Sequence, residues 1–297
     1  MTPPLRIFGV DFTSAPRRAK PIVVARGVLE DGWLAIERVE PIETFAGFER
    51  LLRTKGPWVG GFDFPFGLPR ELVTALGWPD AWPALVTHFA ALDRTAIAAA
   101  FAAFRAARPA GGKYAHRKGD AASRAHSSMK LVNPPVAWML QEGAPRLLAA
   151  GVHIPGLTEG DPDRVALEAY PGLAMRSLAA RLGWKASRSY KNDARSLQTP
   201  AQRDSRIELT DALVQGDYRC GIPLRLASGL RDAAIADGTG DTLDALAAAA
   251  QAAWGALRRD QHFGLPEGID PLEGWIVTAE PFFPGEGGAA AEVALYL

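Results

Sequence analysis

The order of strand-like and helix-like segments in the first 64 residues restricts the possible fold most strongly. Residues 5–14 and 22–30 are apolar runs, and each predicts a strand. Asp31-Gly32 then gives a strong hairpin-turn signal, and residues 33–41 alternate apolar and polar side chains as a half-buried strand does. Three strands with short connections predict an antiparallel meander.

A helix and a fourth strand follow this meander. Apolar residues recur at helical spacing across residues 43–54, so this segment predicts an amphipathic helix. Residues 57–64 predict the fourth strand, which is followed by a proline-containing loop. Because a strand, a crossover helix and a further strand favour parallel pairing, we expect the fourth strand to run parallel to an earlier one.

The remainder of the chain has mainly helical patterns. Neither an internal repeat nor a clear linker interrupts it, so we expect one α/β domain over residues 1–297, with a helical and basic-loop insertion at about 70–160. The segments predicted after residue 64 are helices at 84–107, 134–150, 171–182, 205–214 and 241–258, strands at 165–170 and 275–282, and loops at 109–131 and 185–204.

Composition excludes several kinds of protein and site. Cys220 is the only cysteine, so neither an internal disulfide nor a zinc site of several thiolates can form. The apolar runs are too short for a membrane span and the first residues lack a secretion signal, so we expect a cytoplasmic protein with no membrane partner. Lys plus Arg and Asp plus Glu are 33 each, and this balance counts against a non-specific nucleic-acid binder.

Acidic residues occur near the ends of three predicted strands. Asp11, Asp63 and Glu168 each follow apolar residues. A carboxylate in such surroundings is costly unless it is paired, hydrogen-bonded or bound to a metal, and acids are depleted in strands. If these strands are neighbours, the three acids converge at one edge of the sheet. Their mutual repulsion would raise their pKa values, and a hard divalent cation such as Mg²⁺ would relieve it.

Two more acids open the most strongly predicted helix. Asp241 and Asp244 are three residues apart and therefore share a helix face. Each of the five acids also has a purely structural explanation. These are a turn cap with Thr13 and Ser14 for Asp11, a turn position for Asp63, a solvent-facing edge position for Glu168, an N-cap for Asp241, and a favourable position in the helix dipole for Asp244.

Four segments carry a resemblance to a known family. GVDFTSAP at 9–16, GFDFPFGLP at 61–69, LEAYP at 167–171 and DTLDALAAA at 241–249 resemble the domain-of-unknown-function family 429, whose members are predicted RNase H-like nucleases. The resemblance covers most of the chain. It implies an RNase H-like core, which is a mixed five-stranded sheet with helices on both faces, and the order of elements derived above agrees with it.

The resemblance also implies a reaction and a set of site residues. Nucleases of this superfamily bind two Mg²⁺ or Mn²⁺ ions through acids on the first strand, the fourth strand and a late helix, and they hydrolyse phosphodiester bonds of nucleic acid. The implied metal ligands here are Asp11, Asp63, Asp241 and Asp244, and the implied catalytic residues are Asp11, Asp63, Asp244 and Glu168. The role of Glu168 does not follow from the residues.

Two basic segments, residues 111–130 and 185–206, predict contacts to substrate phosphates. Each segment also fits a solvated loop. The residues predicted to bind phosphate or substrate are Thr13, Ser14, Lys113, Arg117, Lys118, Arg124, Lys191 and Arg195.

Two other functions stay open at this point. GVDFTS is similar to the first phosphate loop of actin-like and sugar-kinase ATP-using enzymes, although the second domain and the Gly-rich adenosine motif of those enzymes are not found in the sequence. The second alternative is a non-catalytic binding module that keeps the acids for metal or structure.

Overall fold

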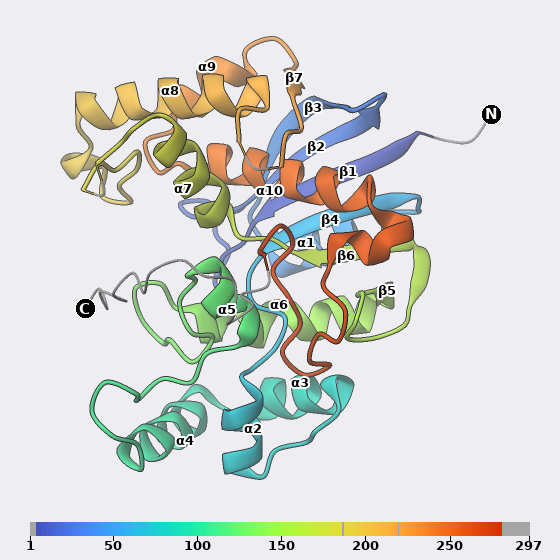
Figure 1. The fold of residues 1–297 in the computed structure, drawn as a ribbon, viewed down its shortest axis with the longest axis vertical. Helices are drawn as coiled ribbons and strands as arrows, with labels where there is room; N and C mark the ends of the chain where they lie inside the picture. Colours follow the sequence, from blue (N-terminus) through green and yellow to red (C-terminus); the bar gives the residue numbers. More distant parts are fainter. Residues whose placement is uncertain (1–3, 186, 219, 281–297) are drawn as a thin grey trace, which may run out of the picture.

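A seven-stranded mixed sheet forms the centre of the computed structural model, which describes residues 4–185, 187–218 and 220–280 (Figure 1). The strand order across the sheet is β5-β6-β4-β1-β2-β3-β7. The strands are β1 (Leu5–Asp11), β2 (Ile22–Glu30), β3 (Trp33–Ile42), β4 (Trp58–Asp63), β5 (Val152–His153), β6 (Asp161–Glu168) and β7 (Leu224–Leu226).

The predicted meander is confirmed. β1 pairs with β2 and β2 pairs with β3, both antiparallel. Asp31 and Gly32 form the turn between β2 and β3, with φ angles of 38° and 85°. Both φ angles lie in the left-handed region, which aspartate and glycine tolerate better than most residues. The fourth strand, β4, runs parallel to β1, as the crossover helix between them predicts.

The sheet has more strands than the five that were expected. β6 lies parallel to β4, and the short strands β5 and β7 extend the two edges. β5 has two residues and β7 has three, so neither is long enough to show a periodic pattern in the sequence. The strand expected at 275–282 is reduced to a single bridge between Ile276 and Glu168, and its last two residues lie outside the described residues.

Helices cover both faces of the sheet. They are α1 (Phe45–Leu52), α2 (Arg70–Leu76), α3 (Trp82–Ala91), α4 (Arg94–Ala106), α5 (Lys118–Ser123), α6 (Val136–Ala150), α7 (Pro171–Arg181), α8 (Pro200–Gln215), α9 (Leu230–Ala236) and α10 (Asp241–Ala256), with short 3₁₀ segments at Arg195–Leu197 and Arg259–Gly264. The helices α2 to α6 lie between β4 and β6 in the chain, where the sequence predicts the insertion.

Several predicted boundaries of helices and loops were wrong. The loop expected at 185–204 contains the 3₁₀ segment at Arg195–Leu197 and the start of α8, which begins at Pro200 because Thr199 caps it there. The single helix expected at 84–107 is broken into α3 and α4, because the side chain of Asp93 accepts a 2.8 Å hydrogen bond from the Ala96 amide and starts a new helix. The loop expected at 109–131 contains α5. Among the described residues no single helix is long and apolar enough to cross a membrane.

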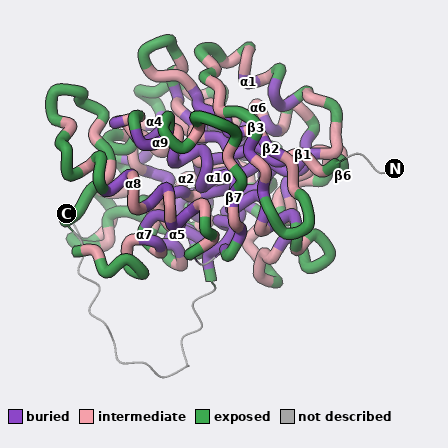
Figure 2. The backbone as a smooth tube through the Cα atoms, turned by 90° about the horizontal axis from the view of Figure 1, so that it is seen from above, coloured by how far each residue is buried: buried purple, intermediate pink, exposed green. Residues whose placement is uncertain are grey.

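The two faces of the sheet have separate cores. On one face α7, α8, α9 and α10 pack against residues such as Ile7 and Val59, and on the other face α1, α2, α3, α4 and α6 pack against residues such as Phe8 and Phe62. Adjacent residues of one strand face opposite cores because side chains alternate along a strand. The buried segments, in purple, gather around α10 at the centre of the molecule, and exposed loops, in green, lie at its periphery (Figure 2).

Candidate active site

The ends of β1 and β4 bring two of the predicted acids side by side. Asp11 is the last residue of β1 and Asp63 is the last residue of β4, and the two are direct partners in the parallel register. Neighbouring strands lie about 4.8 Å apart, and paired residues of parallel strands point to the same face. The convergence expected from the sequence is therefore found for this pair.

Two glycines show which face the pair occupies. A Cβ atom at Gly9 would lie 2.1 Å from the carbonyl oxygen of Ala245, and one at Gly61 would lie 2.4 Å from the carbonyl oxygen of Ala248. Both glycines therefore face α10 and allow it to lie directly on the sheet. Residues two apart in a strand share a face, so Asp11 and Asp63 face α10 as well.

The first turn of α10 supplies the other two acids. Asp241 and Asp244 are its first and fourth residues, and they are only 9% and 2% exposed. Gly240, not Asp241, is the N-cap of α10, and the Thr242 amide in its first turn donates a 2.8 Å hydrogen bond to the carboxylate of Asp237, which also accepts a bond from the Thr239 amide. Capping of the helix thus does not account for Asp241.

The four acids influence one another electrostatically. Burial raises the pKa of Asp11 well above its ordinary value, and the charges of Asp244, Asp241 and Asp63 raise it further. Burial and the charge of Asp244 raise the pKa of Asp63 to about 7. Burial also raises the pKa of Asp241. We call Asp11, Asp63, Asp241 and Asp244 the acid cluster.

A cation from one of the basic segments lies on the acid cluster. The Lys191 ammonium donates a 2.5 Å hydrogen bond to Oδ2 of Asp244, and the Tyr190 hydroxyl donates a 2.7 Å bond to Oδ1. The chain at these two residues crosses the start of α10 closely, since a Cβ atom at Gly240 would lie 2.9 Å from Cδ of Lys191. Although burial alone would lower the pKa of Lys191, the carboxylate of Asp244 raises it above its ordinary value.

The acid cluster has the chemistry of a divalent-metal site. Carboxylate oxygens are the ligands that Mg²⁺ prefers, and no described residue donates a hydrogen bond to the side chains of Asp11 and Asp63. The side chains as they stand do not form a complete metal site: within the described part of the chain, no three His, Cys, Asp or Glu side chains are grouped so that they could hold an ion. Both oxygens of Asp244 are already bonded, so an ion bound there would have to displace at least one partner.

Comparison with known proteins adds no assignment. No family model, no curated protein and no solved structure matches this chain. The resemblance to the domain-of-unknown-function family 429 therefore stays a prediction.

Glu168 is not brought into the acid cluster. It ends β6 and pairs in register with Phe62, so it points to the sheet face opposite to Asp63. Its carboxylate accepts hydrogen bonds of 2.6 and 2.7 Å from Arg117 and one of 2.9 Å from the Phe66 amide. Burial raises its pKa against the lowering effect of Arg117. The structure thus places Glu168 in a buried ion pair that fixes the loop after β4.

Arg117 also cannot make the phosphate contact that its basic segment suggested. It is 2% exposed, and its guanidinium donates to Glu168, to Asp120 and to the carbonyl oxygen of Glu273. These five hydrogen bonds use all five N–H groups of an arginine side chain. The guanidinium therefore has no donor left for a substrate.

The other residues predicted to contact phosphate have varied positions. Thr13 is half-buried and Ser14 is buried, just after Asp11 in the chain. The exposed ones are Lys113, Lys118, Arg124, Lys191 and Arg195. The sequence-based choice of residues missed Asp120 and Glu273 as partners of Arg117 and Lys118, because they carry no motif and Glu273 meets the α5 segment from 155 residues away.

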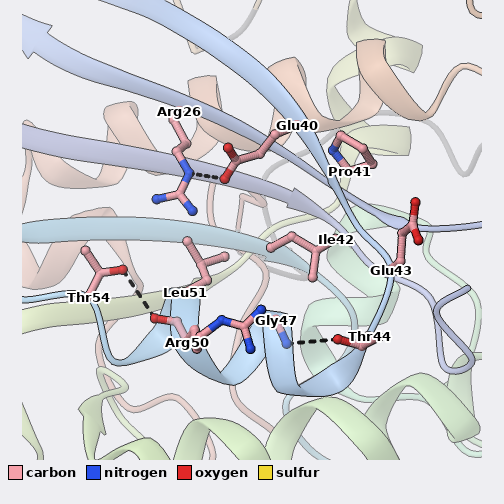
Figure 3. A pocket seen from close by; sticks show the side chains of 10 residues that line it. All are labelled: Arg26, Glu40, Pro41, Ile42, Glu43, Thr44, Gly47, Arg50, Leu51 and Thr54. Carbon is pink, nitrogen blue, oxygen red and sulfur yellow. Dashed lines mark hydrogen bonds and ion pairs between the residues drawn. The ribbon is translucent and has the colours of Figure 1, made fainter. Parts of the chain in front are cut away.

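A cavity of about 410 Å³ lies away from the acid cluster, between the middle of β2, the end of β3 and helix α1 (Figure 3). None of the acid cluster lines it. Its most prominent contact is the 2.5 Å ion pair between Arg26 and Glu40, which closes part of its wall. The residues that line this cavity do not form a group of converging reactive side chains, so the acid cluster remains the candidate active site.

Proposed function

We propose that this chain is an RNase H-like, divalent-metal-dependent hydrolase of phosphodiester bonds in nucleic acid. The observation that carries the proposal is the acid cluster: two acids in register at the ends of parallel strands, faced by two acids on the first turn of the helix that covers them. The fold supports it as well, since β3, β2 and β1 are antiparallel neighbours and β4 and β6 continue the sheet in parallel.

The charges of the acid cluster favour binding of divalent cations. Asp244, Asp241 and Asp63 all raise the pKa of Asp11, so the Asp11 carboxylate lies among the other three and would be a central ligand of the bound ions. Asp63, Asp244 and Asp241 would supply the other carboxylate oxygens that hold the ions. Two bound ions would supply an activated water molecule and stabilise the leaving oxygen. The residues of this chain hold the four carboxylates in place through the pairing of β1 with β4 and the packing of α10.

The basic segments supply a surface for the substrate. Lys191 lies on the acid cluster itself, and Arg117 anchors the other segment beside the loop that follows Asp63. Exposed lysine and arginine side chains in these segments can contact phosphates without reading sequence. A small number of such contacts is compatible with a chain whose formal net charge is zero.

Cleavage assays with labelled DNA and RNA oligonucleotides test the proposal, with Mg²⁺, with Mn²⁺ and with EDTA. We expect metal-dependent cleavage by the native protein and its loss in Asp11→Asn, because this change removes the carboxylate at the centre of the acid cluster. Asp31→Asn, at the exposed hairpin turn, is the matched control and should cleave normally. Unchanged cleavage by Asp11→Asn would reject the assignment, and hydrolysis of ATP in place of oligonucleotides would favour the kinase-like alternative.

A further inference from the structure

Lys191 places a positive charge directly on the acid cluster. Its ammonium lies 2.5 Å from Oδ2 of Asp244, and its positive charge also lowers the pKa of Asp11, Asp63 and Asp241. One side chain therefore compensates charge on every member of the acid cluster. No other lysine or arginine acts on all of Asp11, Asp63 and Asp241 in this way among the described residues.

The two partners in this ion pair differ sharply in exposure. The side chain of Asp244 is 2% exposed, whereas that of Lys191 is 42% exposed. The carboxylate is fixed on α10, but the lysine reaches it from the surface along a flexible four-carbon stem. The ammonium can therefore leave Asp244 by rotation of side-chain bonds alone.

The backbone beside Lys191 is held independently of its ammonium. Arg206 donates a 2.8 Å hydrogen bond to the carbonyl oxygen of Tyr190, the Asn192 amide donates to the carbonyl oxygen of Gly238, and the Tyr190 hydroxyl keeps its own bond to Asp244. Departure of the ammonium thus leaves the segment in place. It frees one oxygen of Asp244 and leaves a lysine at the rim of the acid cluster.

We propose that Lys191 is an exchangeable internal cation, which offsets part of the negative charge of the acid cluster when no divalent ion is bound and is displaced from Asp244 when an ion binds. This inference rests on the proposed function and extends it to the regulation of the same site. The displaced ammonium is then free to contact a phosphate of the substrate next to the metal ions. Binding of the metal ion thus frees the Lys191 ammonium to contact the substrate.

Calorimetric titration with Mn²⁺, in the absence of any substrate, measures this competition directly. In Lys191→Met the ion no longer displaces an ammonium, so we expect Mn²⁺ to bind at least about tenfold more tightly than to the native protein, the low end for a close charge pair with a buried partner. Lys191→Arg keeps the positive charge and should stay near the native affinity. Lys185→Met, an exposed lysine of the same segment, is the matched control and should not change the affinity.

The outcomes separate this inference from the proposed function. Mn²⁺ binding that is equal or weaker in Lys191→Met overturns the exchange but leaves the metal site standing. Absence of Mn²⁺ binding in both proteins, or binding that survives Asp11→Asn, overturns the proposed function as well. If Lys191→Met does not fold, the NMR signal of the Lys191 Cε in the native protein decides: it should move on addition of Mg²⁺, and an unmoved signal at saturating Mg²⁺ refutes the exchange.

Discussion

Replacing Asp63 by asparagine should remove a large pH dependence from the stability of this protein. The pKa of Asp63 is raised from 3.8 to about 7, chiefly by burial and by the charge of Asp244. Between these two values the folded protein holds a proton on Asp63 that the unfolded chain has lost. The free energy of unfolding therefore falls as the pH rises through this window.

The size of the effect follows from the two pKa values. Each factor of ten in a proton equilibrium is worth about 1.4 kcal/mol, so a rise from 3.8 to about 7 corresponds to a loss on the order of 4 kcal/mol. Asparagine has nearly the same shape as the protonated acid and carries no charge at any pH. The stability of Asp63→Asn minus that of the native protein should hence increase by about 2 kcal/mol between pH 5 and pH 7, where half of the folded molecules have already lost the proton.

Urea unfolding in EDTA, followed by circular dichroism at several pH values between 5 and 8, measures this difference. Asp31→Asn in the hairpin turn controls for the replacement of an acid by an amide at an exposed position. Added Mg²⁺ at pH 8 should recover stability in the native protein and much less in Asp63→Asn, since the ion neutralises the same repulsion. A difference between the two proteins that stays constant or shrinks with rising pH would refute the reasoning.

Two further substitutions test the packing around the site. Arg117→Met leaves the carboxylates of Asp120 and Glu168 buried without their partner, so the free energy of unfolding should fall by about 3–5 kcal/mol. The control Arg124→Met, at an exposed position of the same segment, should change it little. A loss below about 1 kcal/mol in Arg117→Met would contradict the role of this ion pair. Gly9→Ala places a Cβ atom 2.1 Å from the backbone of α10 and should destabilise the protein by at least about 2 kcal/mol in urea unfolding. The control Gly112→Ala, where the nearest atom would be 3.9 Å away, should be neutral, and equal stability of the two variants would argue against close packing of α10.

Local patterns in the sequence were sufficient to predict the central strands. The Asp31-Gly32 turn and the alternation in residues 33–41 act over a few residues, so the meander follows from them directly. The acids at the ends of β1 and β4 were predictable for the same reason: once those strands pair in parallel, their last residues must be neighbours. The same holds for Asp241 and Asp244, which share the face of one helix turn.

Features that depend on distant contacts could not be predicted. The ion pair between Arg117 and Glu168 joins residues 51 positions apart, and nothing near either residue indicates the other. The contact of Lys191 with Asp244 spans 53 positions, so the basic segment suggested a phosphate contact but gave no partner. The edge strands β5 and β7 are too short for a periodic signal, and they form only because a longer strand offers them hydrogen bonds.

The register of β4 with β6 has a consequence for how this protein can change by mutation. Asp63 and Glu168 belong to adjacent strands, but the one-residue offset between them directs them to opposite sides of the sheet. The sheet thus separates the acid cluster from the ion pairs of Arg117 with Asp120 and Glu168. On one face the positive charge comes from Lys191, which has access to solvent. On the other face it comes from Arg117, which is buried. Substitution of Lys191 can therefore change metal binding without unfolding the protein, whereas substitution of Arg117 lowers the stability of the fold.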